Sequence, residues 1–197
     1  MDLLSADESQ LSDPQHRFFA SDTIRFFVGG RQCGKSSVAI ATALATVQLG
    51  EDCTLIAPSH EQAGELCDRA HEYREDSVVR QTRTQLEFDT GATLFVTRAT
   101  EYTTHPTEAP THLVVDEAQM LDEDVLFELL DPTDAPAPLA ICGASNPMGV
   151  DLRQIAAYSR FDYVVAPSFT NPAVDMNDVI DRKHARLQAG RDSVVDN

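Results

Sequence analysis

The chain alternates short apolar runs with longer stretches in which apolar residues recur at helical spacing. Short apolar runs that end in Gly, Pro, Ser or Asp are typical of buried strands, and they cover 24–28, 54–58, 111–117, 138–144 and 163–165. Helical spacing, with capping residues at several starts, predicts helices over 13–20, 37–49, 60–74, 117–130, 152–158 and 176–188. Strands that alternate with helices in this way predict an α/β fold, a mostly parallel sheet with helices on both faces.

One region departs from this alternation. Residues 84–89 alternate polar and apolar positions, Thr90-Gly91 has the composition of a turn, and residues 92–97 alternate again. This pattern predicts a hairpin-like pair of strands. Residues 99–111 follow, rich in Thr, Pro and Glu, and we expect a surface loop there.

The first predicted strand runs into a glycine-rich motif. Residues 29–36 fit the pattern G-x-x-x-x-G-K-S between a strand and a helix, which is the context that makes this pattern a phosphate-binding loop, or P-loop. Backbone N–H groups of such a loop surround the phosphates of ATP, the lysine reaches the terminal phosphates, and the serine hydroxyl binds Mg²⁺. The residues expected to line this site are Gly29, Gly30, Arg31, Gln32, Cys33, Gly34, Lys35, Ser36 and Ser37. The alternative is a glycine-rich turn without a ligand.

Other candidate residues lie where predicted strands end, the edge at which open α/β sheets bind ligands. Asp116 could hold Mg²⁺ and Glu117 could polarise the attacking water, or both could be acids favoured at a helix N-terminus. Ser145 and Asn146 could sense the terminal phosphate, or close the strand in a turn. Arg31 could stabilise charge on the transferred phosphoryl group, or pair with a nearby acid.

The composition indicates the environment in which the protein works. The 197 residues include 32 acidic and 15 basic side chains, a net charge of −17, and the only lysines are Lys35 and Lys183. Acidic, lysine-poor chains are typical of high-salt proteomes, where salt screens the repulsion; an ordinary acidic protein is the alternative. No apolar run is long enough for a membrane span, and the N-terminus does not have the pattern of a signal peptide. We therefore expect a soluble intracellular protein whose four cysteines are reduced.

Together these motifs resemble the ATPase domain of the large terminase subunit, the motor that packages DNA in tailed viruses. The stretches that carry the resemblance are Gln15 ahead of the phosphate loop, 55–59, 114–119, 143–147 and 170–172. The resemblance implies a P-loop NTPase fold with three parts: a flexible segment over 1–12, an ATPase core over 13–149, and a lid subdomain or linker over 150–197.

The resemblance also assigns roles to individual residues. Gln15 would contact adenine, and Arg31 would be the arginine of the loop. Asp116 would hold the metal, Glu117 would activate water, and Ser145-Asn146 would couple hydrolysis to movement of the lid. The implied partners are double-stranded DNA, the portal protein and the small terminase subunit. The motor would form a homo-oligomeric ring on the procapsid in the host cytoplasm, with the isolated chain a monomer, and would have no contact with a membrane.

Two departures from the family pattern leave other functions open. Large terminases usually continue into a nuclease domain, which this sequence does not contain, and residues 99–115 hold no arginine that could act on a neighbouring subunit. The alternatives are a helicase-like DNA-dependent ATPase, a small-molecule P-loop kinase, and a non-enzymatic ATP-binding switch in assembly.

Overall fold

The computed structural model describes residues 12–21, 24–30, 33–98, 112–130, 140–144, 150–158 and 162–166, together with positions 177, 180, 181, 184, 185, 187 and 188. The strands are β1 (Ile24–Gly29), β2 (Cys53–Ala57), β3 (Val78–Gln81), β4 (Gln85–Phe88), β5 (Thr93–Arg98), β6 (His112–Val115), β7 (Ala140–Gly143) and β8 (Asp162–Ala166). The helices are α1 (Asp13–Phe19), α2 (Lys35–Gln48), α3 (His60–Tyr73), α5 (Glu123–Leu130) and α6 (Leu152–Tyr158), with short 3₁₀ turns η2 (Glu75–Ser77) and η3 (Ala118–Met120).

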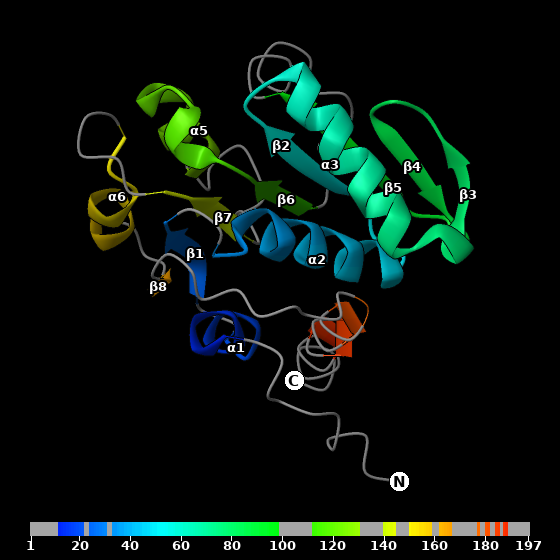
Figure 1. Cartoon of the computed structure of the whole chain (residues 1–197), viewed down its shortest axis with the longest axis horizontal. Helices are drawn as coiled ribbons and strands as arrows, with labels where there is room; N and C mark the ends of the chain where they lie inside the picture. The colour runs from blue at the N-terminus through cyan, green and yellow to red at the C-terminus, as the bar shows by residue number, and fades with distance from the viewer. Residues whose placement is uncertain are drawn as a thin grey trace, which may run out of the picture.

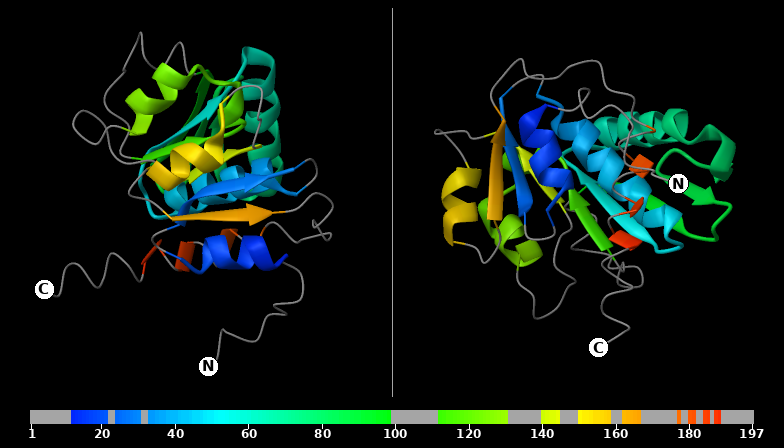
Figure 2. Two further views of the ribbon diagram at one scale, coloured as in Figure 1. Left: turned by 90° about the vertical axis from the view of Figure 1, so that its left-hand side faces the viewer. Right: turned by 90° about the horizontal axis from the view of Figure 1, so that it is seen from below.

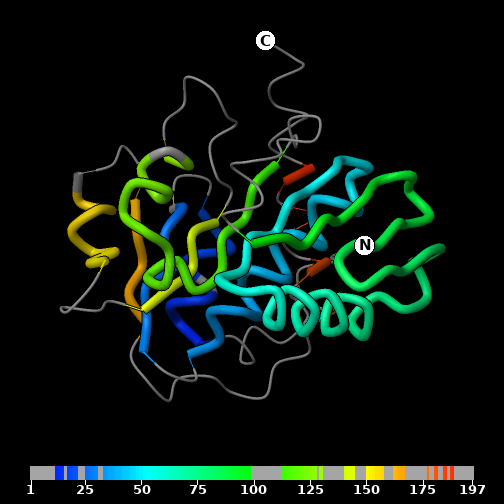
Figure 3. The backbone as a smooth tube through the Cα atoms, turned by 90° about the horizontal axis from the view of Figure 1, so that it is seen from above, coloured from blue at the N-terminus to red at the C-terminus, as the bar shows by residue number. Residues whose placement is uncertain are grey.

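The strands form one sheet in the order β3-β4-β5-β2-β6-β7-β1-β8. Every pair from β5 to β8 is parallel, while β3, β4 and β5 pair antiparallel. In Figure 3 the antiparallel strands lie at one edge of the sheet and β8 lies at the other. The predicted α/β fold with a mostly parallel sheet is confirmed, and so is the hairpin formed by β4 and β5.

Helices cover both faces of the sheet. One apolar core joins side chains of α1, α2 and α3 to one face, and it includes the fully buried Phe18, Leu44 and Leu55. A second core joins α5 and α6 to the opposite face through residues such as Phe26, Val115 and Leu126. Figures 1 and 2 show this three-layer arrangement, in which the described helical positions between 177 and 188 lie on the side of α1.

Local sequence explains how the helices nearest the candidate site begin and end. Helix α2 is apolar around most of its circumference and is buried between the sheet and its neighbours. It starts after Gly34, which has a left-handed backbone with φ of 84°, and it is followed by Gly50 with φ of 78°; both are conformations that glycine adopts at little cost. Helix α3 is capped by Ser59, whose side chain accepts a hydrogen bond from the Gln62 N–H, as its sequence predicts.

One predicted element differs in the structure, and one strand was not predicted. Residues 117–130 do not form one helix, because Glu117 is left-handed and Leu121 is extended, so that η3 and α5 are separate. Strand β3 was not predicted: its residues are mostly exposed and lack the alternation of a half-buried strand. It forms because its backbone pairs with β4 at the edge of the sheet.

The sheet extends past residue 149, since β8 pairs with β1 and α6 packs on both strands. The division into a core and a C-terminal lid stays a prediction. The predicted flexible segment over 1–12, apart from Ser12, and the loop over 99–111 lie outside the described residues, as does the motif at 170–172. In the described part of the chain, none of the helices combines the length and the apolar character that a membrane span requires.

Candidate functional site

The phosphate loop connects β1 to α2 at the carboxyl edge of the sheet. The start of α2 carries no side-chain cap and no acidic residue in its first turn. Its first backbone hydrogen bond runs from the Val38 N–H to the Gly34 carbonyl, 2.9 Å, so the N–H groups of residues 35–37 have no partner within the helix. N–H groups without a helical partner and the positive end of a helix dipole together favour an anion at this position.

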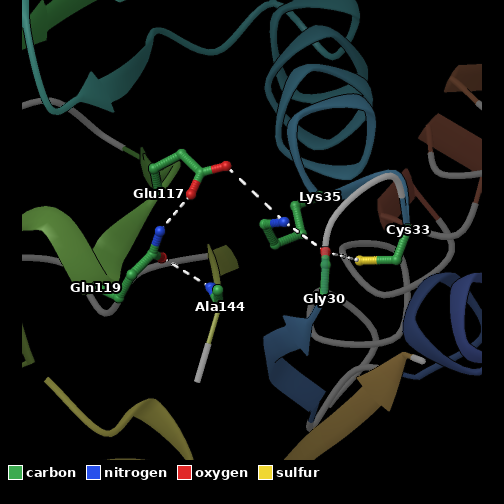
Figure 4. A network of polar contacts seen from close by, with 6 residues as sticks. All are labelled: Gly30, Cys33, Lys35, Glu117, Gln119 and Ala144. Carbon is green, nitrogen blue, oxygen red and sulfur yellow. Dashed lines mark hydrogen bonds and ion pairs between the residues drawn. The ribbon is translucent and has the colours of Figure 1, made fainter. Parts of the chain in front are cut away.

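Lys35 contributes a positive charge to the loop (Figure 4). Its ammonium group donates a hydrogen bond to the Gly30 carbonyl at 2.8 Å and lies 3.9 Å from Glu117 Oε1. The side chain is 8% exposed, so this cation is held inside the molecule against its own loop. The Cys33 thiol donates to the same Gly30 carbonyl at 3.1 Å.

Glycine at position 29 is required by the packing beneath the loop. A Cβ atom there would lie 2.3 Å from Cys33 Sγ and 2.8 Å from the backbone carbonyl oxygen of Ala166 in β8. The second contact is with backbone, which cannot rotate away. The close approach of β1 and β8 therefore fixes the position from which the phosphate loop starts.

Asp116 follows β6 directly and is 3% exposed. Its N–H donates to the Ile56 carbonyl of β2 at 2.9 Å, while its buried Oδ1 has no hydrogen-bond partner. Burial raises the pKa of this carboxyl to about 6; hydrogen bonding from Ser36 and the charge of Lys35 lower it, and the charge of Glu117 raises it. Ser36 and Asp116, from two separate elements, are therefore neighbours.

This donor set fits Mg²⁺. A buried carboxylate oxygen without a partner, beside a serine hydroxyl, offers the hard oxygen ligands that Mg²⁺ prefers. The described residues contain no group of three or more His, Cys, Asp or Glu side chains that could hold a metal ion alone. Such a pair suits an ion that keeps several waters and takes further ligands from phosphates.

Glu117 has an unusual backbone conformation, with φ of 48° and ψ of 43°. It has the only positive φ among the described residues other than glycine, and such a left-handed conformation is costly unless neighbours hold it. The Met120 N–H donates to the Glu117 carbonyl at 2.8 Å and fixes the turn. The carboxylate, 26% exposed, then lies between Lys35 and Gln119.

Sequence reasoning assigned no role to Gln119. Its amide nitrogen donates to Glu117 Oε2, and its amide oxygen accepts the Ala144 N–H at 2.7 Å. A polar residue two positions after Glu117 in a short turn was the available signal. Arg69 of α3 was also missed: its guanidinium donates to the Ser37 hydroxyl at 3.4 Å.

The structure brings together the loop residues Lys35 and Ser36 and the acids Asp116 and Glu117. Gln15 is buried in α1, where its amide oxygen accepts hydrogen bonds from the Ser12 N–H and hydroxyl at 3.1 and 3.0 Å; its contact with adenine stays a prediction. Four predicted residues lie outside the described part of the chain: Arg31, Gln32, Ser145 and Asn146.

All four cysteines are free and buried. Burial raises the pKa of the Cys33 thiol, and raises that of Cys142, next to the site in β7, well above its ordinary value. Since the thiolate is the reactive form, these thiols stay protonated and inert.

A family model described as an AAA domain matches residues 17–146. This range is well over half of the chain and contains both the phosphate loop and the two acids. The chain belongs to the AAA domain family. It is thus an AAA-type P-loop ATPase domain, and the nucleotide-binding edge built above is the one this family implies. No curated protein matches the sequence.

Two similar solved structures are the large terminase ATPase domain of Thermus phage P74-26 and an arginine-to-alanine mutant of it. The sequence identities are 21% and 20%, and the TM-scores are 0.51 and 0.53. Each alignment covers 66% of this chain and 63% of the chain of the solved structure. At this identity the likeness shows the P-loop NTPase fold.

Proposed function

We propose that the chain hydrolyses ATP to drive double-stranded DNA into a viral procapsid, as the ATPase domain of a large terminase subunit. The observation that supports hydrolysis is the meeting of Lys35, Ser36, Asp116 and Glu117 at one edge of the sheet. DNA packaging is supported by the order of the motifs along the chain and by the fold shared with terminase ATPase domains.

Each residue has a distinct task in this reaction. The loop N–H groups and Lys35 bind the triphosphate, with Arg31 as an additional positive charge. Asp116 and the Ser36 hydroxyl would hold Mg²⁺, which when bound neutralises charge on the phosphate oxygens. Glu117 accepts the proton of the attacking water. Its Oε1 now faces Lys35, and it becomes a free acceptor once Lys35 binds a phosphate instead.

The proposed partners are the portal protein, the small terminase subunit and DNA, with the motor as a ring on the procapsid. Residues 99–115 offer no arginine to a neighbouring subunit, so stimulation in the ring depends on residues elsewhere. We expect slow hydrolysis by the isolated chain and faster hydrolysis on assembly with procapsid and DNA.

Displacement of a third DNA strand from a duplex tests translocation directly. The full chain, assembled on procapsids with ATP, is expected to remove a triplex-forming oligonucleotide while leaving the two strands of a forked duplex paired. Lys35→Ala is the inactive control. Strand separation of the fork would instead favour a helicase-like ATPase, and phosphate transfer to a nucleoside monophosphate rather than to water would favour a kinase.

We also propose that the protein works at high salt, in a virus of a halophilic host, because its net charge is −17. Salt weakens protein contacts with DNA phosphates but screens repulsion among surface carboxylates. The ATPase rate and the folding stability are expected to rise between low and molar KCl. A fall in both over that range would contradict this proposal.

A further inference from the structure

The side chain of Gln119 connects two parts of the site that are far apart in sequence. Its amide nitrogen donates to Glu117 Oε2, and its amide oxygen accepts the N–H of Ala144, 25 residues further along the chain. Ala144 directly follows β7, the strand between β6 and β1. Figure 4 shows the amide group between the two partners.

Both ends of this amide are fixed. Because a backbone N–H can only donate, the atom of Gln119 that faces Ala144 must be the oxygen, and the nitrogen must then face the carboxylate. Gly143 provides the space for this contact, since a Cβ atom there would lie 2.5 Å from Gln119 Oε1 and 2.3 Å from Leu152 Cδ1. The side chain therefore has one orientation in which both partners are satisfied.

The two oxygens of Glu117 consequently have different surroundings. Oε2 is held by the neutral amide of Gln119, whereas Oε1 lies 3.9 Å from the Lys35 ammonium group. When Lys35 moves away to bind a phosphate, only Oε1 loses its partner. The amide bond to Oε2 then keeps the carboxylate in place while the other oxygen becomes available.

We propose that Gln119 is a positioning residue for hydrolysis, which holds Glu117 by one oxygen so that the other accepts the proton, and which ties this carboxylate to the end of β7. The inference rests on the proposed role of Glu117. It also gives a physical route between the hydrolysing acid and the segment after Ala144, because a shift of the Ala144 backbone withdraws the N–H donor that orients the amide. Ser145 and Asn146, the predicted coupling residues, follow Ala144 in the sequence.

Two substitutions separate the ends of the bridge. Gln119→Ala removes both hydrogen bonds, whereas Gln119→Glu keeps an acceptor for Ala144 and replaces the donor with a second negative charge beside Glu117. Gln154→Ala, at an exposed position of α6, is the matched control. Phosphate release is measured with Mg-ATP in a single turnover and at steady state, and affinity with a fluorescent ATP analogue.

We expect both Gln119 variants to lose about tenfold or more in kcat with KM and affinity within about twofold of wild type, since a misplaced base impairs only the chemical step. Gln154→Ala should match wild type. In the Glu117→Gln background, adding Gln119→Ala should change the rate by less than about twofold, because the two residues act as a unit. Thermal unfolding of each variant shows that it is folded.

Three results would overturn the inference. The first is that Gln119→Ala and Gln119→Glu hydrolyse ATP at the wild-type rate, and the second is that the substitutions change KM alone. The third is that Gln119→Ala lowers the rate by the same factor in the wild-type and the Glu117→Gln backgrounds. The proposed role of Glu117 is tested separately in the same series. If Glu117→Gln is inactive while both Gln119 variants are active, only the positioning role is wrong. If Glu117→Gln hydrolyses ATP at the wild-type rate, both are wrong.

Discussion

The two halves of the candidate site, the loop from β1 to α2 and the turn after β6, are built in different ways. Among the described residues, the loop half consists of backbone N–H groups at an uncapped helix start and the cation of Lys35, which is hydrogen-bonded to its own loop. Its parts lie within a few residues of one another, and α2 behind it is apolar and buried. This half can form from local sequence once β1 and α2 are in place.

The turn after β6 is built from contacts with distant segments. Asp116 has Ser36 as its neighbour, and Glu117 lies between Lys35 and Gln119, which in turn is anchored on Ala144. This half also contains a left-handed glutamate and a buried carboxylate oxygen without a partner. Such costs recur at functional sites. We therefore expect the loop half to bind the nucleotide and the acidic half to carry out the chemistry, so that mutations should separate the two.

The largest expected effect comes from Glu117→Gln, which keeps the shape of the side chain but removes the proton acceptor. Loss of a general base costs about a hundredfold or more in rate, while ATP affinity should change little because the loop half is intact. Phosphate release and nucleotide titration measure the two quantities. Glu123→Gln, at an exposed position in α5, is the matched control. A Glu117→Gln variant that loses affinity but not rate would break the division of labour.

Asp116→Asn is expected to stabilise the protein in a pH-dependent way. Burial raises the pKa of Asp116 from 3.8 to about 6. Between pH 3.8 and about 6 the carboxyl is therefore protonated in the folded state but ionised in the unfolded chain. The stability that this proton confers is present below about pH 4 and is lost as the pH rises to about 6. Asparagine has no such titration. We expect the free energy of unfolding of the variant to exceed that of wild type by roughly 2 to 3 kcal/mol at pH 8, and by less at pH 5.

Urea unfolding at pH 5 and pH 8 measures this difference. Asp124→Asn, exposed on α5, should show the same small change at both values. An advantage of Asp116→Asn that does not grow with pH would contradict the assignment of a buried, penalised carboxylate to the acidic half. Mg-dependent hydrolysis should be lost in the same variant despite its stability.

Smaller effects are expected from replacing one glycine with alanine in each half of the site, Gly29 in the loop half and Gly143 beside the acidic half. At Gly29 the added Cβ meets Cys33 Sγ and the Ala166 backbone, so ATP affinity should fall. At Gly143 it meets Gln119 Oε1 and Leu152, so the rate should fall while affinity is kept. We expect about tenfold in each case, which corresponds to about 1.4 kcal/mol.

Gly64→Ala is the control for this pair. Its added Cβ lies 3.7 Å from the nearest atom, Arg83 Nε, an ordinary contact. In a helix interior this change stabilises by roughly 0.5 to 1 kcal/mol, and we expect no effect on affinity or rate. Equal losses of affinity at Gly29 and Gly143 would show that the halves are not separable.

The same contrast explains which features the sequence could predict. The phosphate loop, the Ser59 cap and the β4–β5 hairpin depend on neighbouring residues, and their patterns predicted them. The bridge through Gln119 depends on β7 lying beside β6, which no local pattern reports. The break between η3 and α5 was also missed, because it depends on the extended backbone of Leu121. The apolar pattern of 117–130 does not record that constraint.

The most direct test of the central claim is a crystal structure of the chain with Mg²⁺ and a non-hydrolysable ATP analogue. The account predicts that Lys35 leaves the Gly30 carbonyl for the terminal phosphate, that Asp116 and Ser36 lie on the metal side, and that Glu117 Oε1 faces the terminal phosphate while Gln119 keeps Oε2. A triphosphate bound away from α2, or a Lys35 that stays on Gly30 with Asp116 remote from the phosphates, would contradict it.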